Sequence, residues 1–210
     1  PLWTLYADHF AAADAPAAGP APDAVAAAMR RVGWEKMSRG ADGICFGVAG
    51  MALTLNGIAQ GFITDRAYDI MAAAGMRHVL LDIGEWRALG PRPGGGAWRI
   101  GVADPLAPWR VLARQGLDDG RAIATSAPAG APFDAMLRHH HLFDPRTGHS
   151  ARSWKSVSVV AANAALADAL STALAVAAPE RAAGILAKFP DAGALLLDAQ
   201  GMLIRIGHLD

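Results

Sequence analysis

The chain has 210 residues, with 19 Lys and Arg against 19 Asp and Glu, so its formal net charge is zero. A neutral chain lacks the basic surface that binds duplex nucleic acid through many phosphates, so we expect no nucleic-acid partner. The single cysteine, Cys45, excludes an internal disulfide and a cysteine zinc cluster. Charges or prolines interrupt every long apolar stretch, and we expect no transmembrane segment.

The N-terminal region predicts a loop, a short helix and a hairpin. The Ala- and Pro-rich residues 11–22 favour a loop, and residues 23–31 predict a helix that Gly33 ends. Short apolar runs at residues 44–48 and 51–55 flank an Ala-Gly pair that favours a tight turn. We therefore expect these two runs to pair as antiparallel strands.

Residues 58–74 predict an amphipathic helix, because apolar side chains recur at helical spacing and Gly75 follows them. We expect the buried face of this helix to contain Ile58, Phe62, Ala67, Ile70, Met71 and Ala74. Residues 77–83 then predict a buried strand that ends at Gly84.

The rest of the chain alternates runs of strands with helices. Strands are predicted at residues 87–89, 98–102, 111–117, 122–125 and 156–161, helices at 164–178 and onward to Lys188, and a final hairpin at 194–197 and 202–206. Hairpin-like runs with inserted helices favour an α+β fold over a regular βαβ repeat.

The first candidate site is a pair of oxygen-bearing residues on a helix. Asp168 and Thr172 are four residues apart, so they share one face of an otherwise small and apolar helix. A carboxylate and a hydroxyl offer two oxygen ligands to a hard cation, and such a cation usually binds phosphates as well. Spacing alone favours the ordinary alternative, in which Asp168 is a first-turn or solvent-facing residue and the Thr172 hydroxyl bonds back to its own helix.

The second candidate is a run of three histidines followed by Asp-Pro-Arg-Thr-Gly. Adjacent residues of a strand alternate faces, so His139, His140 and His141 do not converge on one metal ion. We expect one inward histidine, with His140 pointing outward, and a tight turn over residues 144–148 that could hold a ligand. A plain surface turn is the alternative.

The third candidate is a passage from strand to helix at residues 54–62, where small residues let a ligand approach the backbone. Free amides at a helix N-terminus attract phosphate, although turns of this kind often serve packing only. A weaker signal is the hydroxyl pair Thr125-Ser126 after a predicted strand.

Taken in order, these segments resemble one family, the ApbE-like flavin transferases or FAD:protein FMN transferases. The resemblance is carried by residues 56–62 with Asp65, by 81–84 with 87–90, by 98–102 with Asp104-Pro105, and by 124–126, 141–148 and 167–173. It implies an ApbE-like fold of mainly antiparallel sheets with inserted and packed helices, in a single domain over residues 1–210.

The resemblance begins near Pro1 and lacks the family's N-terminal portion. Because the first residue is also not Met, we expect the chain to start inside a longer protein, with any export signal upstream. The family implies a periplasmic or exported location, with membrane association an open option.

The activity implied by the resemblance is magnesium-dependent transfer of FMN from FAD to a threonine hydroxyl of an acceptor flavoprotein, with release of AMP. By resemblance, Mg²⁺ is held by Asp168, Thr172 and the carbonyl of Gly57, and His141 and Asp144 are catalytic. The implied contacts to FAD are Asn56, Gly57, Ile58, Ala59, Gln60, Ser126, His141 and Thr147.

The chain departs from the family pattern at three places. Thr54, Asn56 and Gln60 replace a carboxylate, a glycine and a lysine, Glu85 replaces a glycine, and Ala127 stands where glycine is common. These differences resemble a subgroup such as the accessory proteins of nitrous oxide reductase maturation. They leave two alternatives open: an FAD pyrophosphatase, and an FAD-binding maturation factor without turnover.

The departure at residue 60 generates a prediction. Gln60 can donate a hydrogen bond but carries no charge, so we expect its contact with an anionic or carbonyl group of FAD to be weakened but not lost. We expect Gln60→Lys to lower the Kd for FAD in a fluorescence titration. An unchanged Kd would mean that residue 60 does not face the ligand.

Overall fold

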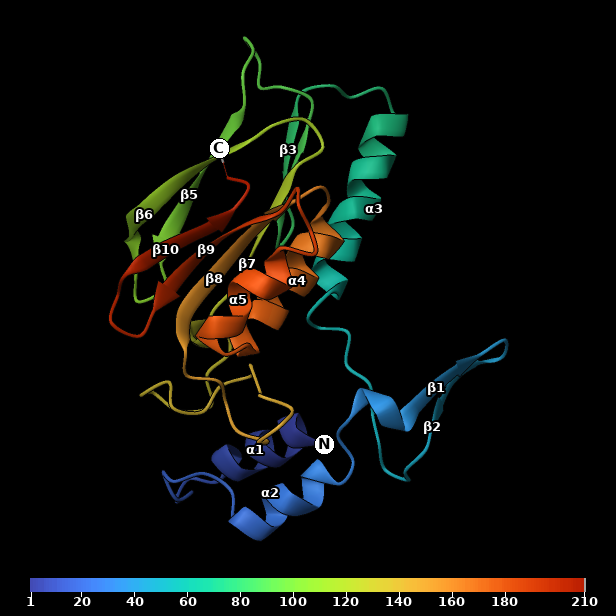
Figure 1. The fold of residues 1–210 in the computed structure, drawn as a ribbon, viewed down its shortest axis with the longest axis vertical. Coiled ribbons are helices and arrows are strands. Elements are labelled where there is room, and N and C mark those ends of the chain that lie inside the picture. Colours follow the sequence, from blue (N-terminus) through green and yellow to red (C-terminus); the bar gives the residue numbers. More distant parts are fainter. Residues whose placement is uncertain (210) are drawn as a thin grey trace. The chain divides into compact units, whose positions relative to one another are not determined.

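The computed structural model describes residues 1–209 and divides into two compact units (Figure 1). Unit 1 contains Pro1–Thr54 and Pro128–Ala151, and unit 2 contains Leu55–Ala127 and Arg152–Asp210, of which Asp210 lies outside the described residues. The single domain expected over residues 1–210 stays a prediction. Among the described residues, no helix has the length and apolar character needed to cross a membrane.

Unit 1 contains helices and one hairpin. Its elements are α1 (Leu2–Ala11), α2 (Pro22–Met29), the 3-10 helices η1 (Trp34–Lys36) and η2 (Pro128–Gly130), and strands β1 (Met37–Gly40) and β2 (Gly43–Phe46). Leu2 and Tyr6 of α1 pack against Val25 and Ala28 of α2, with Phe133 and Phe143 beside them. This small aromatic core anchors the segment that carries the three histidines.

Two predictions for unit 1 are wrong. The hairpin pairs β1 with β2 around a turn at residues 41–42, and residues 51–55 form no strand. Gly43, with φ at 128°, supplies the left-handed conformation that closes this earlier turn. Helix α1 was not expected from the sequence.

Unit 2 is built on a six-stranded antiparallel sheet of order β10-β9-β8-β7-β4-β3. Its strands are β3 (Val79–Asp82), β4 (Trp86–Leu89), β7 (Ala122–Ser126), β8 (Trp154–Ala161), β9 (Gly193–Asp198) and β10 (Leu203–Gly207). A separate hairpin sheet consists of β5 (Trp98–Asp104) and β6 (Ala107–Leu117). All strands predicted from residue 77 onward are present, and the α+β fold class is confirmed.

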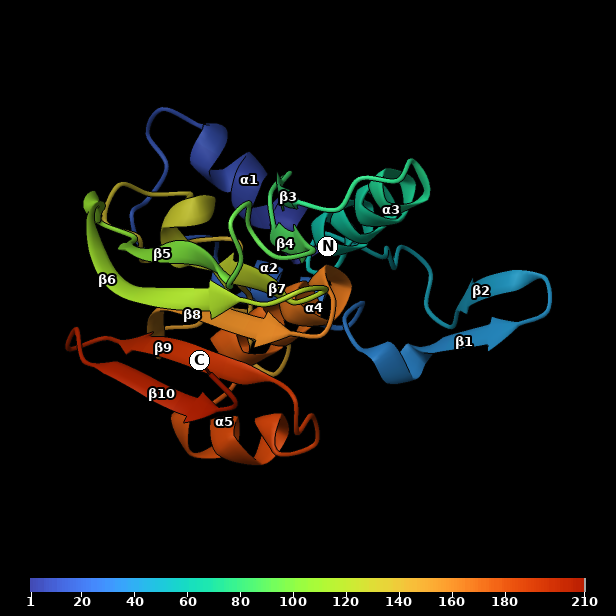
Figure 2. The ribbon, with the colours of Figure 1, turned by 90° about the horizontal axis from the view of Figure 1, so that it is seen from above.

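Helices and the β5–β6 sheet lie on different sides of the six-stranded sheet (Figures 1 and 2). The helices are α3 (Ala59–Ala73), α4 (Ala164–Val176) and α5 (Pro179–Leu186), and α4 packs against β7 and β8. Side chains of β5 and β6 share a core with Ile123, Val160 and Leu195 of the central strands. The sheet thus holds α4 in place on one side and is itself stabilised by apolar burial on the other.

Helix α3 forms where the sequence predicts it, but its buried face is not the predicted one. Phe62 and Ile70 are 58% and 65% exposed, whereas Gly61 and Thr64 are buried. A Cβ atom at Gly61 would collide with the backbone carbonyl of Ala164, so α3 approaches α4 through its small residues. Close backbone packing decides the orientation of this helix, and apolar spacing does not.

Candidate functional site

Asp168 is a buried carboxylate that faces α3. It lies on α4, whose N-terminus is capped by the Asn163 side chain accepting from the Leu166 amide at 2.9 Å. Only 5% of Asp168 is exposed, and its Oδ2 accepts a 3.0 Å hydrogen bond from the amide of Gly61. The solvent-facing alternative for Asp168 is therefore wrong.

Thr172 lies one turn further along α4, among small polar residues. The hydroxyl of Ser126 is 3.2 Å from the Thr172 hydroxyl and 2.8 Å from that of Ser171. A Cβ built on Gly57 would be 3.2 Å from Thr172 Oγ1, so the backbone of Gly57 passes directly beside this hydroxyl. The hydroxyl that bonds back to the helix is that of Ser171, which donates to the carbonyl of Asp168 at 3.0 Å.

These residues form a mixed oxygen site. Among residues 1–209, no group of three or more His, Cys, Asp or Glu side chains is arranged to hold a metal. One carboxylate, one hydroxyl and one nearby backbone segment remain, which suits a hard cation that keeps water and phosphate as its other ligands. The donor set fits Mg²⁺ and does not fit zinc, which prefers nitrogen and sulfur.

Glu85 is a second buried carboxyl group near Asp168, and only 6% of it is exposed. Burial, and to a smaller extent the negative charges of Asp168 and Asp82, raise the pKa of Glu85 to about 8, against the lowering effect of a backbone hydrogen bond at Thr125. Burial also raises the pKa of Asp168, against the lowering effect of the Gly61 amide. The site is therefore short of positive charge, which a bound cation would supply.

The strand-to-helix passage at residues 54–62 does not offer a row of free amides. The amides of Ile58 and Ala59 both donate to the carbonyl of Leu55, at 2.9 and 2.8 Å, and the Gly61 amide is used by Asp168. The expectation of free amides is wrong at these three positions. The function of the passage is instead to bring Gly57 and Gly61 close to α4.

Gln60 contacts the turn between β3 and β4. A Cβ built on Gly84 would lie 3.0 Å from Gln60 Nε2, which places this side chain beside the Gly84-Glu85 turn. The sequence singled out Glu85 only as a departure from a family pattern. The signal that could have marked Glu85 as buried is its position, directly after a buried strand and Gly84.

The histidine segment belongs to unit 1 and is not a strand, since only isolated bridges occur there, at His140 and Phe143. His140 is 1% exposed, with Nε2 2.8 Å from the carbonyl oxygen of Ala151. The expected outward orientation of His140 is therefore wrong, because the alternation of a strand does not apply.

His141 is half-buried, and its Nδ1 lies 3.3 Å from the carbonyl oxygen of Ala131. Because a carbonyl only accepts, this contact favours the tautomer with a proton on Nδ1, leaving Nε2 as the basic nitrogen. Burial lowers the pKa of His141, and the hydrogen bond to Ala131 partly offsets that effect. The lowered pKa favours the neutral form of the ring.

The turn that follows is fixed by its own hydrogen bonds and by α2. The carbonyl of Asp144 accepts from the amides of Thr147 and Gly148, and the Asp144 carboxylate pairs with Arg146 at 2.7 Å. The hydrogen bonds from Arg146 lower the pKa of Asp144. Gly148, with φ at 76°, lies against Met29, where a Cβ would not fit. Turn geometry is as predicted, and the functional roles of His141, Asp144 and Thr147 stay predictions.

Unit 2 therefore brings together five of the predicted site positions: Gly57, Gln60, Ser126, Asp168 and Thr172. Residues 1–196 match the family model described as the ApbE family. The chain belongs to the ApbE family.

Relatives named FAD:protein FMN transferase are similar to this chain over much of its length. This chain is 31% identical over 215 residues to the FAD:protein FMN transferase of Treponema pallidum. The alignment covers 93% of this chain and 57% of the relative. The chain is 37% identical over 129 residues to the enzyme of the same name from Rhodobacter capsulatus, covering 61% of this chain and 24% of the relative.

Solved ApbE structures share the fold. The ApbE protein of Thermotoga maritima superposes with a TM-score of 0.79 at 31% identity, over 89% of this chain and 62% of that one. The apo flavinyl transferase ApbE of Pseudomonas stutzeri gives 0.75 at 27% identity, over 98% and 64%. The chain thus spans less than two thirds of the length of each of these relatives.

The buried carboxyl of Glu85 generates a prediction for stability. Its pKa of about 8 in the folded state lies above the ordinary value of 4.5, so the folded protein holds a proton that the unfolded chain releases between these values. The free energy of unfolding should fall as pH rises from about 5 to 8, and Glu85→Gln should reduce that fall by at least about 1 kcal/mol.

Urea denaturation at a series of pH values, without divalent cations, measures this slope. The exposed Glu180→Gln is the matched control and should keep the wild-type slope. An unchanged slope in Glu85→Gln would contradict the assignment.

Proposed function

We propose that this chain carries the cation- and phosphate-binding part of an FAD:protein FMN transferase. The reaction transfers FMN from FAD to a threonine hydroxyl of an acceptor flavoprotein and releases AMP. The observation that carries the proposal is the buried Asp168 one turn before Thr172, with the Gly57 backbone beside the Thr172 hydroxyl, in a chain of the ApbE family.

The chemistry is a displacement at phosphorus. The threonine oxygen forms a bond to the phosphorus of the FMN half, the bond from that phosphorus to the bridging oxygen breaks, and AMP leaves with the electron pair. The threonine loses its proton, and the flavin keeps its oxidation state. Such a reaction needs positioning and charge neutralisation, and little covalent help from the protein.

Asp168, Thr172 and the carbonyl of Gly57 would hold Mg²⁺, which supplies positive charge to the pyrophosphate when bound. The Asp168 carboxylate provides the negative charge that attracts the ion, and its bond from the Gly61 amide fixes its orientation. The Ser126 hydroxyl, 3.2 Å from that of Thr172, restrains the rotamer of the threonine ligand.

His141 is proposed as the acceptor of the threonine proton. Two observations support this role: a pKa lowered by burial, which keeps the ring neutral, and the contact of Nδ1 with the Ala131 carbonyl, which leaves Nε2 basic. The Asp144 carboxylate is held by Arg146 and would act by shaping the turn after His141.

One experiment separates the candidate activities. The protein is incubated with FAD, Mg²⁺ and a candidate acceptor flavoprotein, and covalent flavin fluorescence is sought in a denaturing gel. A fluorescent acceptor band supports the transferase. Free FMN and AMP without a band would indicate an FAD pyrophosphatase, and intact bound FAD would indicate a maturation factor without turnover.

The first prediction concerns Asp168→Asn, which keeps an oxygen for the Gly61 amide but removes the charge. We expect the rate of FAD cleavage at saturating Mg²⁺ to fall on the order of 100-fold, because the only charged ligand is gone. Thr172→Val should reduce the rate less, since it removes a neutral ligand. Wild-type cleavage by Asp168→Asn across a magnesium titration would show that the proposed cation site is wrong.

The second prediction concerns His141→Ala, which should lower FMN transfer by about 100-fold while FAD binding is largely kept. In the wild type, transfer should fall with decreasing pH, at pH values below the ordinary histidine range, because the pKa of His141 is lowered and only the neutral ring accepts a proton. His140→Ala should instead lower the thermal midpoint, since that ring is buried. A flat pH profile together with an active His141→Ala would exclude the base assignment.

A further inference from the structure

Helices α3 and α4 meet along an antiparallel seam with a regular register. Gly57, just before α3, lies against Thr172; Gly61 donates to Asp168; and Asp65 accepts from Ala164. From one contact to the next, the residue on the α3 side lies four positions later in the sequence, and the residue on α4 lies four positions earlier. The contacts therefore follow one another at intervals of one helical turn, and the two predicted metal ligands occupy the first two.

Asp65 forms the third contact, and both of its oxygens are used. Oδ1 accepts from the Ala164 amide at 2.8 Å and Oδ2 from the Ala165 amide at 3.0 Å. Asn163 satisfies the next amide of α4, so a side chain of α3 completes the N-terminal cap of α4. The carboxylate charge at this helix end adds a favourable interaction with the helix dipole.

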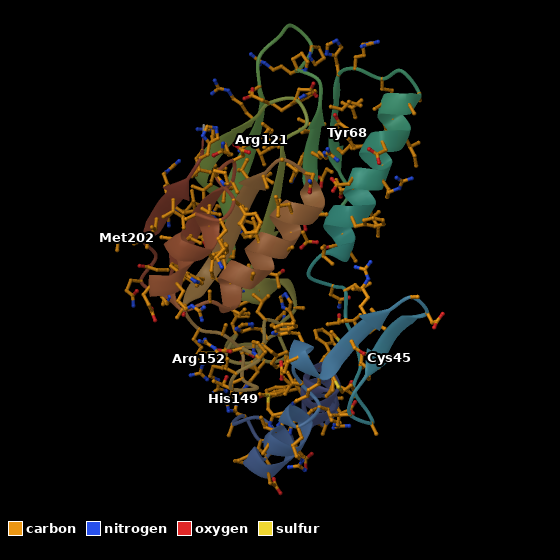
Figure 3. All side chains as sticks on the ribbon, turned by 45° about the vertical axis from the view of Figure 1, so that its right-hand side comes forward. Cys45, Tyr68, Arg121, His149, Arg152 and Met202 are labelled. Atoms are coloured by element: carbon orange, nitrogen blue, oxygen red, sulfur yellow. The ribbon has the colours of Figure 1, made fainter. Side chains whose placement is uncertain are left out.

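Arg87 of β4 holds Asp65 in this position. Its Nη1 donates to Asp65 Oδ1 at 2.7 Å, and its Nε donates to the carbonyl of Gly120 at 3.2 Å. The guanidinium carbon lies 3.7 Å from the ring centroid of Tyr68, which projects from the side of α3 near the strands (Figure 3). The side chains of Arg87 and Asp65 are 12% and 17% exposed, so the pair is largely shielded from water.

The glycines of the seam cannot fix its register by themselves. Gly57 and Gly61 permit the close approach of the two backbones but have no side chains to interlock. Among the described residues, the polar contacts between α3 and α4 are the Gly61 amide on Asp168 and the Asp65 carboxylate on Ala164 and Ala165. Without Asp65, the polar contact left between the two helices is the Gly61 amide on Asp168, and the position of α4 otherwise depends on its packing against α3, β7 and β8.

We propose that Asp65 and Arg87 are positioning residues of the cation site, acting through the register of α4. The proposal rests on the proposed function, because it takes Asp168 and Thr172 as the cation's ligands. Displacement of α4 by a fraction of a turn would separate Thr172 from Gly57 and weaken cation binding, although neither Asp65 nor Arg87 touches the cation.

The test compares Asp65→Asn and Arg87→Gln with the wild type. Asp65→Asn keeps an acceptor for the cap but loses the charge, and Arg87→Gln leaves the cap and loses the pair. Mn²⁺ affinity is measured in the presence of FAD, and FAD affinity is measured without metal. We expect Mn²⁺ binding to weaken about 10-fold in each variant, with metal-free FAD affinity changed less than about twofold.

The same helix offers a matched control. Arg66 and Asp69 form an ion pair at 3.1 Å on the exposed side of α3. Asp69→Asn and Arg66→Gln therefore make equivalent changes in charge without touching the seam, and both should keep wild-type Mn²⁺ affinity. Circular dichroism and thermal midpoints are recorded for all four variants, so that loss of folding is recognised directly.

Each outcome bears on one claim. If Asp65→Asn and Arg87→Gln only lower the thermal midpoint and keep wild-type Mn²⁺ affinity, the positioning role is overturned. The same holds if the wild type binds no Mn²⁺ or if the Arg66 and Asp69 controls weaken Mn²⁺ equally. A wild type that binds Mn²⁺ and FAD but transfers no flavin contradicts the proposed function, while the effect of the seam variants on affinity still decides the positioning role.

Discussion

The close approach of α3 to α4 is the constraint on which the candidate site depends. Gly61 allows the two backbones to touch at Ala164, and the same contact turns the Gly61 amide toward Asp168. The approach also brings the Gly57 backbone against Thr172. A side chain at Gly61 would push the helices apart, and one at Gly57 would press on the Thr172 side chain, so either would disturb the geometry that places a carboxylate, a hydroxyl and a backbone segment together.

Burial of charge is the second property of this seam. Asp168 and Glu85 are both nearly inaccessible to solvent, and burial raises the pKa of each. The ionised form of each buried carboxyl group is costly, and a bound cation would lower that cost, which makes the site receptive to an external cation. Asp65, by contrast, is paired with Arg87. This carboxylate lies at the other end of the seam, where it caps the N-terminus of α4.

Much of unit 2 follows from local pattern, because its strands are short apolar runs bounded by glycine and proline. The candidate cation ligands Asp168 and Thr172 could also be selected from the sequence, since their spacing places them on one helix face. The buried face of α3 could not be predicted in the same way. Phe62 and Ile70 follow apolar spacing but are exposed, because the close contact at Gly61 decides how the helix packs. The buried His140 and the Asp65 cap depend on segments far apart in sequence, which periodicity does not report.

A crystal structure of the protein with Mn²⁺ and FAD would test the proposed cation site most directly, because Mn²⁺ is located by its anomalous scattering. We expect a peak at about 2.1 Å from an Asp168 oxygen, the Thr172 hydroxyl and the Gly57 carbonyl, with pyrophosphate oxygens completing its coordination. A peak bound elsewhere, or FAD bound with its pyrophosphate away from these residues, would contradict it.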